Sequence, residues 1–429
     1  MEKRIFIFAK RKAIYIAVCI LLAIVAILGS AICIIGYLFH YFSFTSGENE
    51  VHGMAISAPL TESDFLTVSG NKIVNQRGEE ILLEGVNLGG WLLQEYWMCP
   101  VQGSKEVAQW TNLETLNILE ERFGSQKTQE LVEHYEDNWI TEWDIQNIAS
   151  IGCNVIRVPF WYRNFLENPN GEWISENPEE NPGFQRLDWI IETAEKYGMY
   201  VILDMHGCPG GQNSDHTSGS ARRCELYSNP EYQNAMEKLW IAIASRYKES
   251  VAVAAYDIMN EPFVTEIESI KQDPRNIIYN RMVQAIRSVD SNHILMIEGI
   301  WTLSVLPDPA EMGWKNVVYE VHPYGVGETD SACKEYRRYS QQYNVPIYVG
   351  EYSDMNMLES CREYEIHHTS WTYKGSKYME ETWFMYYPDR LLYANVCSDP
   401  YWLIKIKWGN CLSTQFFTEN GEILQLWNK

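Results

Sequence analysis

The stretch "VAAYDIMNEPF" (253–263) decides the fold, because an apolar run that suits a buried strand is followed directly by polar residues. Its first half is a nearly continuous apolar run, which is typical of a parallel strand covered by helices on both faces. Asn260 and Glu261 follow this run, and Pro262 is expected to end the strand. A carboxylate at this place can be an ordinary strand-end residue. Its meaning therefore depends on how the other strands of the chain end.

Seven further apolar runs alternate with helical stretches along the chain. Two of the stretches between them, "RLDWIIETAEKYG" and "NAMEKLWIAIASRYK", carry apolar residues at helical spacing. Repeated strand–helix units predict an α/β fold, a (β/α)8 TIM barrel, rather than an open doubly wound sheet. No GxGxxG or Walker motif follows a strand, so nothing favours a nucleotide-binding fold. The eight predicted strands lie in 81–88, 153–160, 199–206, 253–261, 293–299, 316–324, 345–352 and 366–374.

An N-terminal hairpin precedes the barrel in "FLTVSGNKIVNQRGEEILLEGVNL" (65–88), with its turn expected near residues 75–78. We expect one extracellular domain over 65–429, preceded by a polar linker at 40–64. The tail from residue 378 onward, rich in Trp and Tyr, has two interpretations. It is either the last helix with a lid, or packing alone.

One transmembrane helix is predicted over residues 13–39, a run of apolar residues without a charged side chain and long enough to cross a bilayer. The alternative is a cleaved signal peptide, whose apolar part usually has about 7–15 residues. Basic residues lie before the span and acidic ones after it, so residues 1–12 are expected in the cytoplasm. This predicts a single-pass cell-membrane protein whose N-terminal helix acts as a signal anchor.

The composition excludes some classes of function. The 429 residues include 57 acidic and 34 basic ones, a net charge of -23, which disfavours nucleic acid as a partner. Sixteen Trp and 27 Tyr supply flat faces that fill cores and also stack on sugar rings, so this excess alone does not establish a sugar site. We expect the folded domain to be a monomer.

The cysteines predict neither a metal site nor a fixed disulfide pattern. Eight of the ten follow the predicted span, and Cys208 with Cys224 is one pairing that would close a loop. Eight reduced cysteines are the alternative. No CxxC pair or Cys/His cluster has zinc spacing, so we expect no metal and no cofactor.

Polar side chains recur where the predicted strands end. Because the carboxyl ends of barrel strands meet at one face, these side chains are expected to gather there. Each has an ordinary explanation by itself, but eight at matching places favour a functional site. They are Arg157, His206, Asn260, Glu261, His322, Tyr324, Glu351 and Trp371.

Two of these residues have the chemistry that breaks a sugar acetal bond. Such a reaction needs one protonated carboxyl group to donate to the leaving oxygen and one ionised carboxylate to attack the anomeric carbon. Glu261 and Glu351 end the fourth and seventh strands, which can face each other across the barrel mouth. Arg157 is expected to keep one of them ionised, while a less polar pocket keeps the other protonated.

The motifs "IRVP", "DMHG", "MNEP", "VHPY", "VGEY" and "SWTYK", in this order, resemble glycoside hydrolase family 5, the cellulase-type retaining β-glycosidases. The resemblance implies that Glu261 is the acid/base and Glu351 the nucleophile. It also implies a 2-hydroxyl contact for Asn260, orientation of Glu351 by Tyr324, and a sugar floor at Trp371. Arg157, His206 and His322 would support the pair.

A narrower resemblance, to the exo-β-1,3-glucanase branch, is carried by "GVNLGGWLLQEYW" (85–97) and "HGCPGGQNSDHTSG" (206–219). It implies that Glu95 contacts a terminal glucose, and that residues 212–219 block one end of the cleft. Trp91, Gln212 and Asn213 are counted with the substrate-binding side chains. Tyr96 stands where that branch has proline, and the short interval from Glu351 to Trp371 predicts a shortened seventh helix.

We therefore expect a membrane-anchored retaining hydrolase of a β-glucan or β-glucoside, with β-1,3-glucan attacked in exo mode for carbohydrate catabolism. A hydrolase of glycolipid or steryl β-glucosides is the alternative substrate class, since an anchor would hold the pocket near a bilayer. A non-catalytic membrane-anchored glycan-binding protein is the alternative from another class, although it would not need both glutamates.

Overall fold

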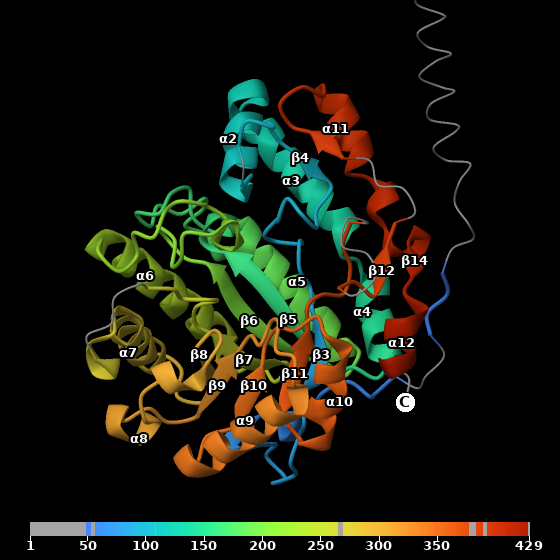
Figure 1. The fold of residues 1–429 in the computed structure, drawn as a ribbon. Helices are drawn as coiled ribbons and strands as arrows, with labels where there is room; N and C mark the ends of the chain where they lie inside the picture. The colour runs from blue at the N-terminus through green and yellow to red at the C-terminus, as the bar shows by residue number, and fades with distance from the viewer. Residues whose placement is uncertain are drawn as a thin grey trace, which may run out of the picture. The chain divides into compact units, whose positions relative to one another are not determined.

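Eight parallel strands close into a barrel, and its ring order follows the chain: β3, β5, β6, β7, β8, β9, β10, β11 and back to β3 (Figure 1). The predicted barrel is confirmed, and each of the eight predicted runs overlaps one of these strands. The computed structural model describes residues 49–52, 56–107, 109–264, 269–376, 383–388 and 393–427. The strands are β3 (Glu84–Asn87), β5 (Val155–Trp161), β6 (Tyr200–Gly207), β7 (Val253–Asp257), β8 (Ile294–Glu298), β9 (Val317–Val321), β10 (Ile347–Val349) and β11 (His367–Ser370).

Helices follow the strands and surround the barrel. Several begin at an Asn-Pro or Asp-Pro pair, where the Asn or Asp side chain caps the helix and proline supplies its first residue. Asn181, for example, accepts a hydrogen bond of 3.1 Å from the amide of Gly183. The seventh helix, α10, has nine residues against 18 in α6, as predicted. The surrounding helices are α4 (Glu142–Ser150), α5 (Pro182–Lys196), α6 (Pro230–Tyr247), α7 (Pro274–Arg287), α8 (Pro309–Met312), α9 (Thr329–Tyr343), α10 (Met355–Glu363) and α12 (Gly421–Trp427).

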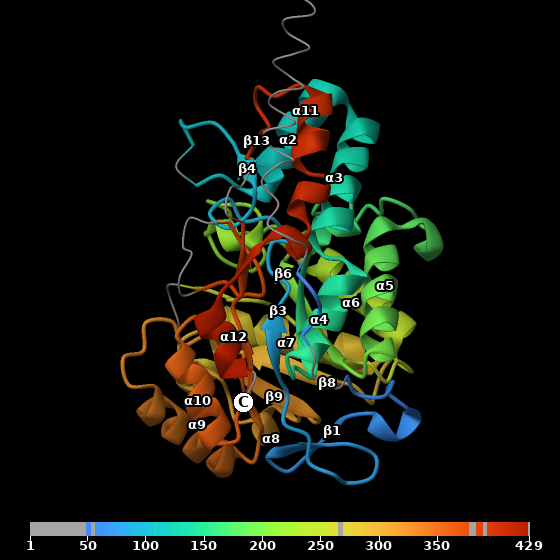
Figure 2. The ribbon, with the colours of Figure 1, turned by 90° about the vertical axis from the view of Figure 1, so that its right-hand side faces the viewer.

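The N-terminal hairpin covers the end of the barrel where the strands begin. Its strands, β1 (Thr67–Ser69) and β2 (Lys72–Val74), are joined by a turn at residues 70–71. The turn predicted near 75–78 is therefore not the turn of this hairpin; the chain reverses there a second time, so that Val74 pairs with Glu80. Apolar side chains of the hairpin pack on the apolar side chains that fill this end of the barrel. Figure 2 shows β1 at the opposite end of the barrel from α2 and α3.

Two insertions build a layer over the other end of the barrel. The first follows β3 and contains β4 (Val101–Gln102), α2 (Asn112–Phe123) and α3 (Ser125–Trp139). The second follows β11 and contains β12 (Tyr386–Tyr387), β13 (Ala394–Asn395), α11 (Tyr401–Lys407) and β14 (Thr418–Glu419). β13 pairs in parallel with β4, and β12 pairs with β14. The tail therefore supplies this second insertion as well as the last barrel helix.

Lys374 ties the two insertions together from a buried position. Its ammonium group donates to the carbonyl oxygen of Trp139, to that of Leu412 at 2.7 Å and to the hydroxyl of Thr414 at 2.9 Å. The same group lies 4.9 Å from the centre of the Phe417 ring. Burial lowers the pKa of Lys374 to about 8, so it stays charged at neutral pH.

Cys208 and Cys224 are both free thiols in the structure. The pairing of Cys208 with Cys224 is therefore not formed, and each thiol instead contacts a backbone carbonyl, that of Met205 and that of Phe263.

The predicted span, residues 1–12 before it and the first residues of the linker lie outside the described residues. Within the ranges that the structure describes, no helix is both long and apolar enough to cross a membrane.

Replacing Lys374 by Met is expected to lower the free energy of unfolding by about 2–4 kcal/mol, because two buried carbonyl groups lose their donor. Urea unfolding of both proteins at pH 7 measures this difference. The control is Lys405→Met on α11, an exposed position where a change within about 0.5 kcal/mol is expected. Equal stabilities of the two variants would contradict the stabilising role of Lys374 between the two insertions.

Candidate active site

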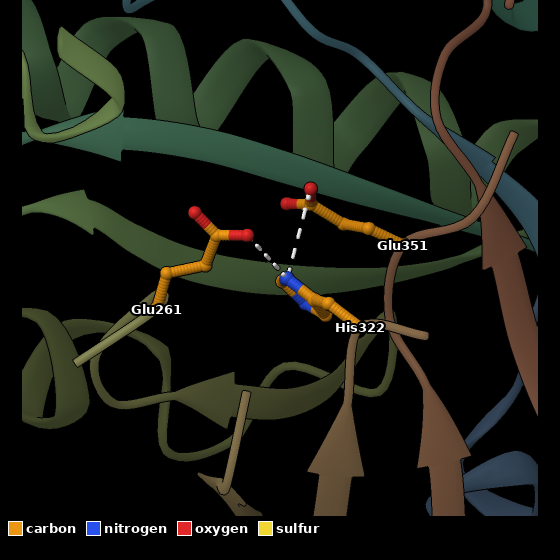
Figure 3. A group of neighbouring side chains, drawn as sticks. All are labelled: Glu261, His322 and Glu351. Atoms are coloured by element: carbon orange, nitrogen blue, oxygen red, sulfur yellow. Dashed lines mark hydrogen bonds and ion pairs between the residues drawn. The ribbon is translucent and has the colours of Figure 1, made fainter. Parts of the chain in front are cut away.

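The polar residues predicted at the strand ends come together at the insertion-covered end of the barrel. Glu261 follows β7 and Glu351 follows β10, and both approach His322, which follows β9 (Figure 3). One oxygen of each glutamate and one ring nitrogen of the histidine all lie within 4.8 Å of one another. The two glutamates are thus close enough to act on a single bond.

Both carboxylate oxygens of Glu351 accept hydrogen bonds. Arg157 donates to Oε1 at 2.7 Å, and the hydroxyl of Tyr324 donates to Oε2 at 2.9 Å. Two donors, one of them cationic, stabilise negative charge on this carboxylate. They also fix its orientation, which suits a group that must attack a carbon atom.

Glu261 lies in a different environment. Its side chain is 21% exposed, and its Oε1 lies 3.2 Å from Nδ1 of His322. Burial raises the pKa of Glu261 to about 7; the negative charge of Glu95 acts in the same direction, whereas positive charge at His206 opposes it. The pair therefore combines one carboxylate held by donors with one carboxyl group that keeps its proton near neutral pH.

The backbone of Glu261 has a left-handed conformation, with φ at 42°, which is strained for a residue with a side chain. Two hydrogen bonds hold it there. Its amide donates to Glu298 at 2.6 Å, and its carbonyl accepts from the side chain of Asn213 at 3.0 Å. The surrounding structure therefore determines the direction of the Glu261 side chain.

A layer of buried carboxyl groups lies under the pair and was not predicted. Its members are Asp204, Asp257, Glu298 and Glu320. Arg157 donates to Asp257 at 2.7 Å and lies 3.1 Å from Asp204. Burial raises the pKa of Asp257 to about 7 and those of Glu298 and Glu320 well above the usual value. These groups therefore bind protons readily at neutral pH.

A sequence signal for part of this layer exists. Asp204 and Glu320 each stand two residues before a predicted histidine, in "DMH" and "EVH". Residues i and i+2 of a strand point to the same face, so an acid two positions before a barrel histidine is expected beside it. The structure shows that contact at 2.7 Å for His206 with Asp204 and at 3.2 Å for His322 with Glu320.

His206 forms a wall of the site together with Trp371. Their rings stack with centroids 5.4 Å apart and planes 13° from parallel. Burial alone would lower the pKa of His206, but the Asp204 carboxylate outweighs this and raises it to about 9. Asn260 lies beside them, and its side-chain oxygen accepts from Arg157 at 2.8 Å.

Gly350, directly before Glu351, leaves the space that His322 and Glu320 use. A Cβ atom at this position would lie 1.8 Å from Oε1 of Glu320 and 2.8 Å from Nε2 of His322. No side chain fits there without moving the histidine that contacts Glu261.

Glu95 and the loop after β6 border the same site. The indole of Trp97 donates to Glu95 at 2.9 Å, and His216 lies 3.3 Å from the same oxygen. Gln212 is fully buried, and its amide group donates to the carbonyls of His206 and Asn260, both at 2.8 Å. Gln212 and Asn213 therefore position the loop that carries Glu261, and their side-chain amides bond to the protein itself.

Trp91 does not lie as predicted for a sugar-binding side chain. It is 1% exposed, its indole donates to the carbonyl of Glu136 on α3 at 3.0 Å, and its ring packs edge-on against Trp189 of α5. The physical reason is that the first insertion covers this part of the "GGWLL" segment, so the indole is used to pack α3 on the barrel.

Aromatic side chains near the site were missed because the sequence does not separate exposed rings from core rings. Phe263 and Trp301 are 40% and 61% exposed, and their centroids lie 5.7 Å apart in the segments that follow β7 and β8. Trp383 stacks on Tyr324 at 5.3 Å. These rings offer flat apolar surface beside Glu261 and Glu351.

The spacing of Glu261, His322 and Glu351 would also suit a metal ion. The donor set fits a cation poorly, because Arg157 already places positive charge 2.7 Å from Glu351. The same contacts fit a network that shares protons.

The model of the cellulase family, glycosyl hydrolase family 5, matches residues 102–389. The chain belongs to this family. The resemblance seen in the motifs is thus confirmed, and the barrel and the paired glutamates are consistent with it.

Two relatives illustrate the similarity. A beta-xylosidase of Phanerodontia chrysosporium is 31% identical over 279 residues, which cover 63% of this chain and 54% of that protein. A probable glucan 1,3-beta-glucosidase A of Aspergillus niger is 27% identical over 304 residues, covering 66% of this chain and 67% of that protein. The matched part thus spans about half of the first relative and about two thirds of the second.

Solved structures share the fold at lower identity. The rutinosidase from Aspergillus niger has a TM-score of 0.52 and 20% identity, with 68% of this chain and 90% of that chain covered. An endogalactoceramidase has a TM-score of 0.55 and 17% identity, with 73% and 76% covered.

Proposed function

We propose that this protein is a retaining β-glycosidase in which Glu261 is the acid/base and Glu351 the nucleophile. The observation that carries the proposal is the separation of the two glutamates, whose nearest oxygens lie within 4.8 Å. Retaining enzymes hold their carboxyl groups about 5–5.5 Å apart, whereas inverting enzymes need about 6.5–9.5 Å to admit a water molecule.

In the first step, the carboxylate of Glu351 attacks the anomeric carbon while protonated Glu261 donates its proton to the glycosidic oxygen. The bond between that carbon and oxygen breaks, and the sugar becomes an ester of Glu351. In the second step, ionised Glu261 takes a proton from water, the hydroxide oxygen bonds to the anomeric carbon, and the ester bond breaks. Both glutamates return to their starting states.

The neighbours are suited to these steps. Tyr324 and Arg157 hold Glu351 in one orientation, which favours attack along a fixed line. His322 has its pKa lowered to about 3, mainly by burial, so it is neutral and can bond to Glu261 without removing the acid's proton. Trp371 and His206 present a flat wall for the sugar ring.

The proposed substrate is a β-glucan or β-glucoside, with β-1,3-glucan attacked from its non-reducing end. Several of the relatives are named glucan 1,3-beta-glucosidases, and Glu95 with the 206–219 segment stands at one side of the catalytic pair. Glu95 has its pKa lowered: burial would raise it, but His216 outweighs that effect. An ionised carboxylate suits recognition of hydroxyl groups on a terminal sugar.

We also propose that residues 13–39 anchor the catalytic domain to the cell membrane as a single-pass, N-in segment. The support is the uncharged apolar stretch and the basic residues before it.

Glu351→Ala is expected to lose glycosyl-enzyme formation and nearly all activity, while leaving space for a small anion on the same face. With an activated aryl β-glucoside, azide should restore turnover and give an α-glycosyl azide, which NMR identifies. Glu335→Ala on the exposed face of α9 is the control and should keep full activity. High activity of Glu351→Ala without azide would contradict the role of Glu351, and an inverted wild-type product would contradict the mechanism.

The pH dependence of kcat/KM should have a basic limb set by Glu261. Its pKa of about 7 means that the active, protonated form is half complete at this pH, nearly complete more than about one unit below it, and falls about tenfold per pH unit well above it. A phenyl β-glucoside, which needs a proton on its leaving group, should show this limb. A dinitrophenyl glucoside, which leaves unaided, should not. The same limb with both substrates, or in Glu261→Gln, would assign it to another group.

The end-wise mode is tested on a soluble β-1,3-glucan by following viscosity together with released glucose. Slow loss of viscosity with glucose as the main early product is expected, and Glu95→Gln should raise KM for the polymer at least tenfold. A rapid fall in viscosity with mixed oligosaccharides would show internal cleavage instead. Parallel assays on cellulose, mannan and glucosyl lipids test the other substrate classes.

A further inference from the structure

Glu298, the last residue of β8, approaches the acid/base by two separate routes. One carboxyl oxygen, Oε2, accepts a hydrogen bond of 2.6 Å from the backbone amide of Glu261. The other, Oε1, lies 3.3 Å from Nδ1 of His322, and the same nitrogen lies 3.2 Å from Oε1 of Glu261 (Figure 3). The contacts therefore run from the backbone of Glu261 through Glu298 and His322 back to the carboxyl group of Glu261.

Glu261 needs a support of this kind because its backbone is strained and its charge changes. Its left-handed conformation, with φ at 42°, persists only where other contacts hold it. In the proposed reaction its carboxyl group loses a proton in the first step and regains one in the second. A support bonded to the backbone amide is present in both states, whereas a bond to the carboxyl group alone would change with each of them.

Glu298 is itself held in place. It is 1% exposed, and its amide donates to the hydroxyl of Tyr279 on α7 at 3.1 Å. The Tyr279 hydroxyl lies 3.1 Å from the carbonyl oxygen of Glu298 and 3.2 Å from that of Met259, two residues before Glu261. One tyrosine thus ties the end of β8 to the segment that carries the acid/base.

The two residues after Glu298 hold the segment that carries His322. Ile300 also has a left-handed backbone, with φ at 61°, and its carbonyl oxygen accepts from the amide of His322 at 2.6 Å. The amide of Gly299 donates to the carbonyl oxygen of Glu320 at 2.9 Å. Residues 298–300 therefore fix both the backbone of the acid/base and the histidine beside its carboxyl group.

A buried acid near the other end of β8 has a different set of contacts. Asp290, before the start of this strand, lies 2.7 Å from the ring of His293 and accepts from the hydroxyl of Tyr256 at 2.9 Å, so it serves the core. Oε2 of Glu298 bonds to the acid/base segment instead, and its Oε1 has no hydrogen-bond partner among the described residues. That oxygen is therefore available to Nδ1 of His322.

We propose that Glu298 is a positioning residue for the reaction, which keeps the carboxyl group of Glu261 within reach of the glycosidic oxygen. The inference rests on the acid/base role proposed for Glu261. A misplacement of about 1 Å can cost about 100-fold in rate, so loss of this support should act on proton transfer to the leaving group.

The test compares kcat/KM of Glu298→Ala and the wild type on a phenyl and a dinitrophenyl β-glucoside. Only the phenyl glucoside needs a proton from Glu261. Its kcat/KM should fall about 30-fold or more, and that of the dinitrophenyl glucoside less than about threefold, because a misplaced acid loses proton transfer alone. A smaller folded fraction would lower both values equally.

Two further variants separate position from folding. Glu298→Gln keeps an oxygen for the amide of Glu261 and should stay within about fivefold of the wild type on both substrates. Glu298→Asp places its carboxyl group one methylene short of that amide. It should lose about tenfold on the phenyl glucoside alone, and it decides the matter if Glu298→Ala does not fold. Asp290→Ala is the control, which should lower stability but leave the ratio of the two kcat/KM values unchanged.

An equal loss on both substrates in Glu298→Ala, no loss, or a Glu298→Gln enzyme as impaired as Glu298→Ala would overturn the proposal. Glu261→Ala distinguishes this failure from that of the catalytic proposal. If Glu261→Ala loses activity selectively on the phenyl glucoside and Glu298→Ala does not, only the positioning role is wrong. If Glu261→Ala loses both activities equally, the acid/base assignment is wrong and the positioning role with it.

Discussion

The active end of the barrel depends on one buried cation. Arg157 is fully buried on β5, and it contacts Asp204, Asp257, Asn260 and Glu351, which come from three other parts of the ring. Burial opposes its charge, but the acidic side chains around it, led by Asp204 and Asp257, outweigh burial and raise the pKa of Arg157 well above the usual value. Removing one partner of such a buried ion pair typically lowers the free energy of unfolding by about 3–5 kcal/mol, because the other charge is left buried and unpaired. The charged side chains of the site therefore hold one another in place.

The barrel interior is divided accordingly. The end covered by the hairpin is filled with aliphatic and aromatic side chains, whereas the opposite end holds carboxyl groups, histidines and Arg157. The packed apolar layer supports the polar layer and keeps water from reaching it through the hairpin end of the barrel. Low polarity in turn strengthens each hydrogen bond in the site and raises the pKa values of its acids. Stability and chemistry are thus supplied by different layers of the same strands.

The sequence predicted the parts that follow from local pattern. Apolar runs with polar ends located the eight strands, Glu261 and Glu351, because a parallel barrel brings those ends to one face. It did not show that Trp91 packs under the first insertion or that Gln212 bonds only to backbone, since both depend on contacts with distant segments. Asp257 accepts from Arg157 on β5, and Glu298 accepts from the amide of Glu261 after β7. No local spacing in the sequence marks these two acids.

The buried acids also explain how Glu261 can hold a proton beside so many carboxyl groups. Arg157 and protonated His206 bring two positive charges, which lie beside the side chains of Asp204 and Glu351. Asp257, Glu298 and Glu320, whose pKa values are raised, take up protons readily and so add less negative charge than three ordinary carboxylates would. Glu298 accepts the amide of Glu261 while remaining close to neutral, so it fixes the strained backbone without repelling the side chain. A second ionised carboxylate at that place would push the pKa of Glu261 further up and slow its return to the base form that the second step requires.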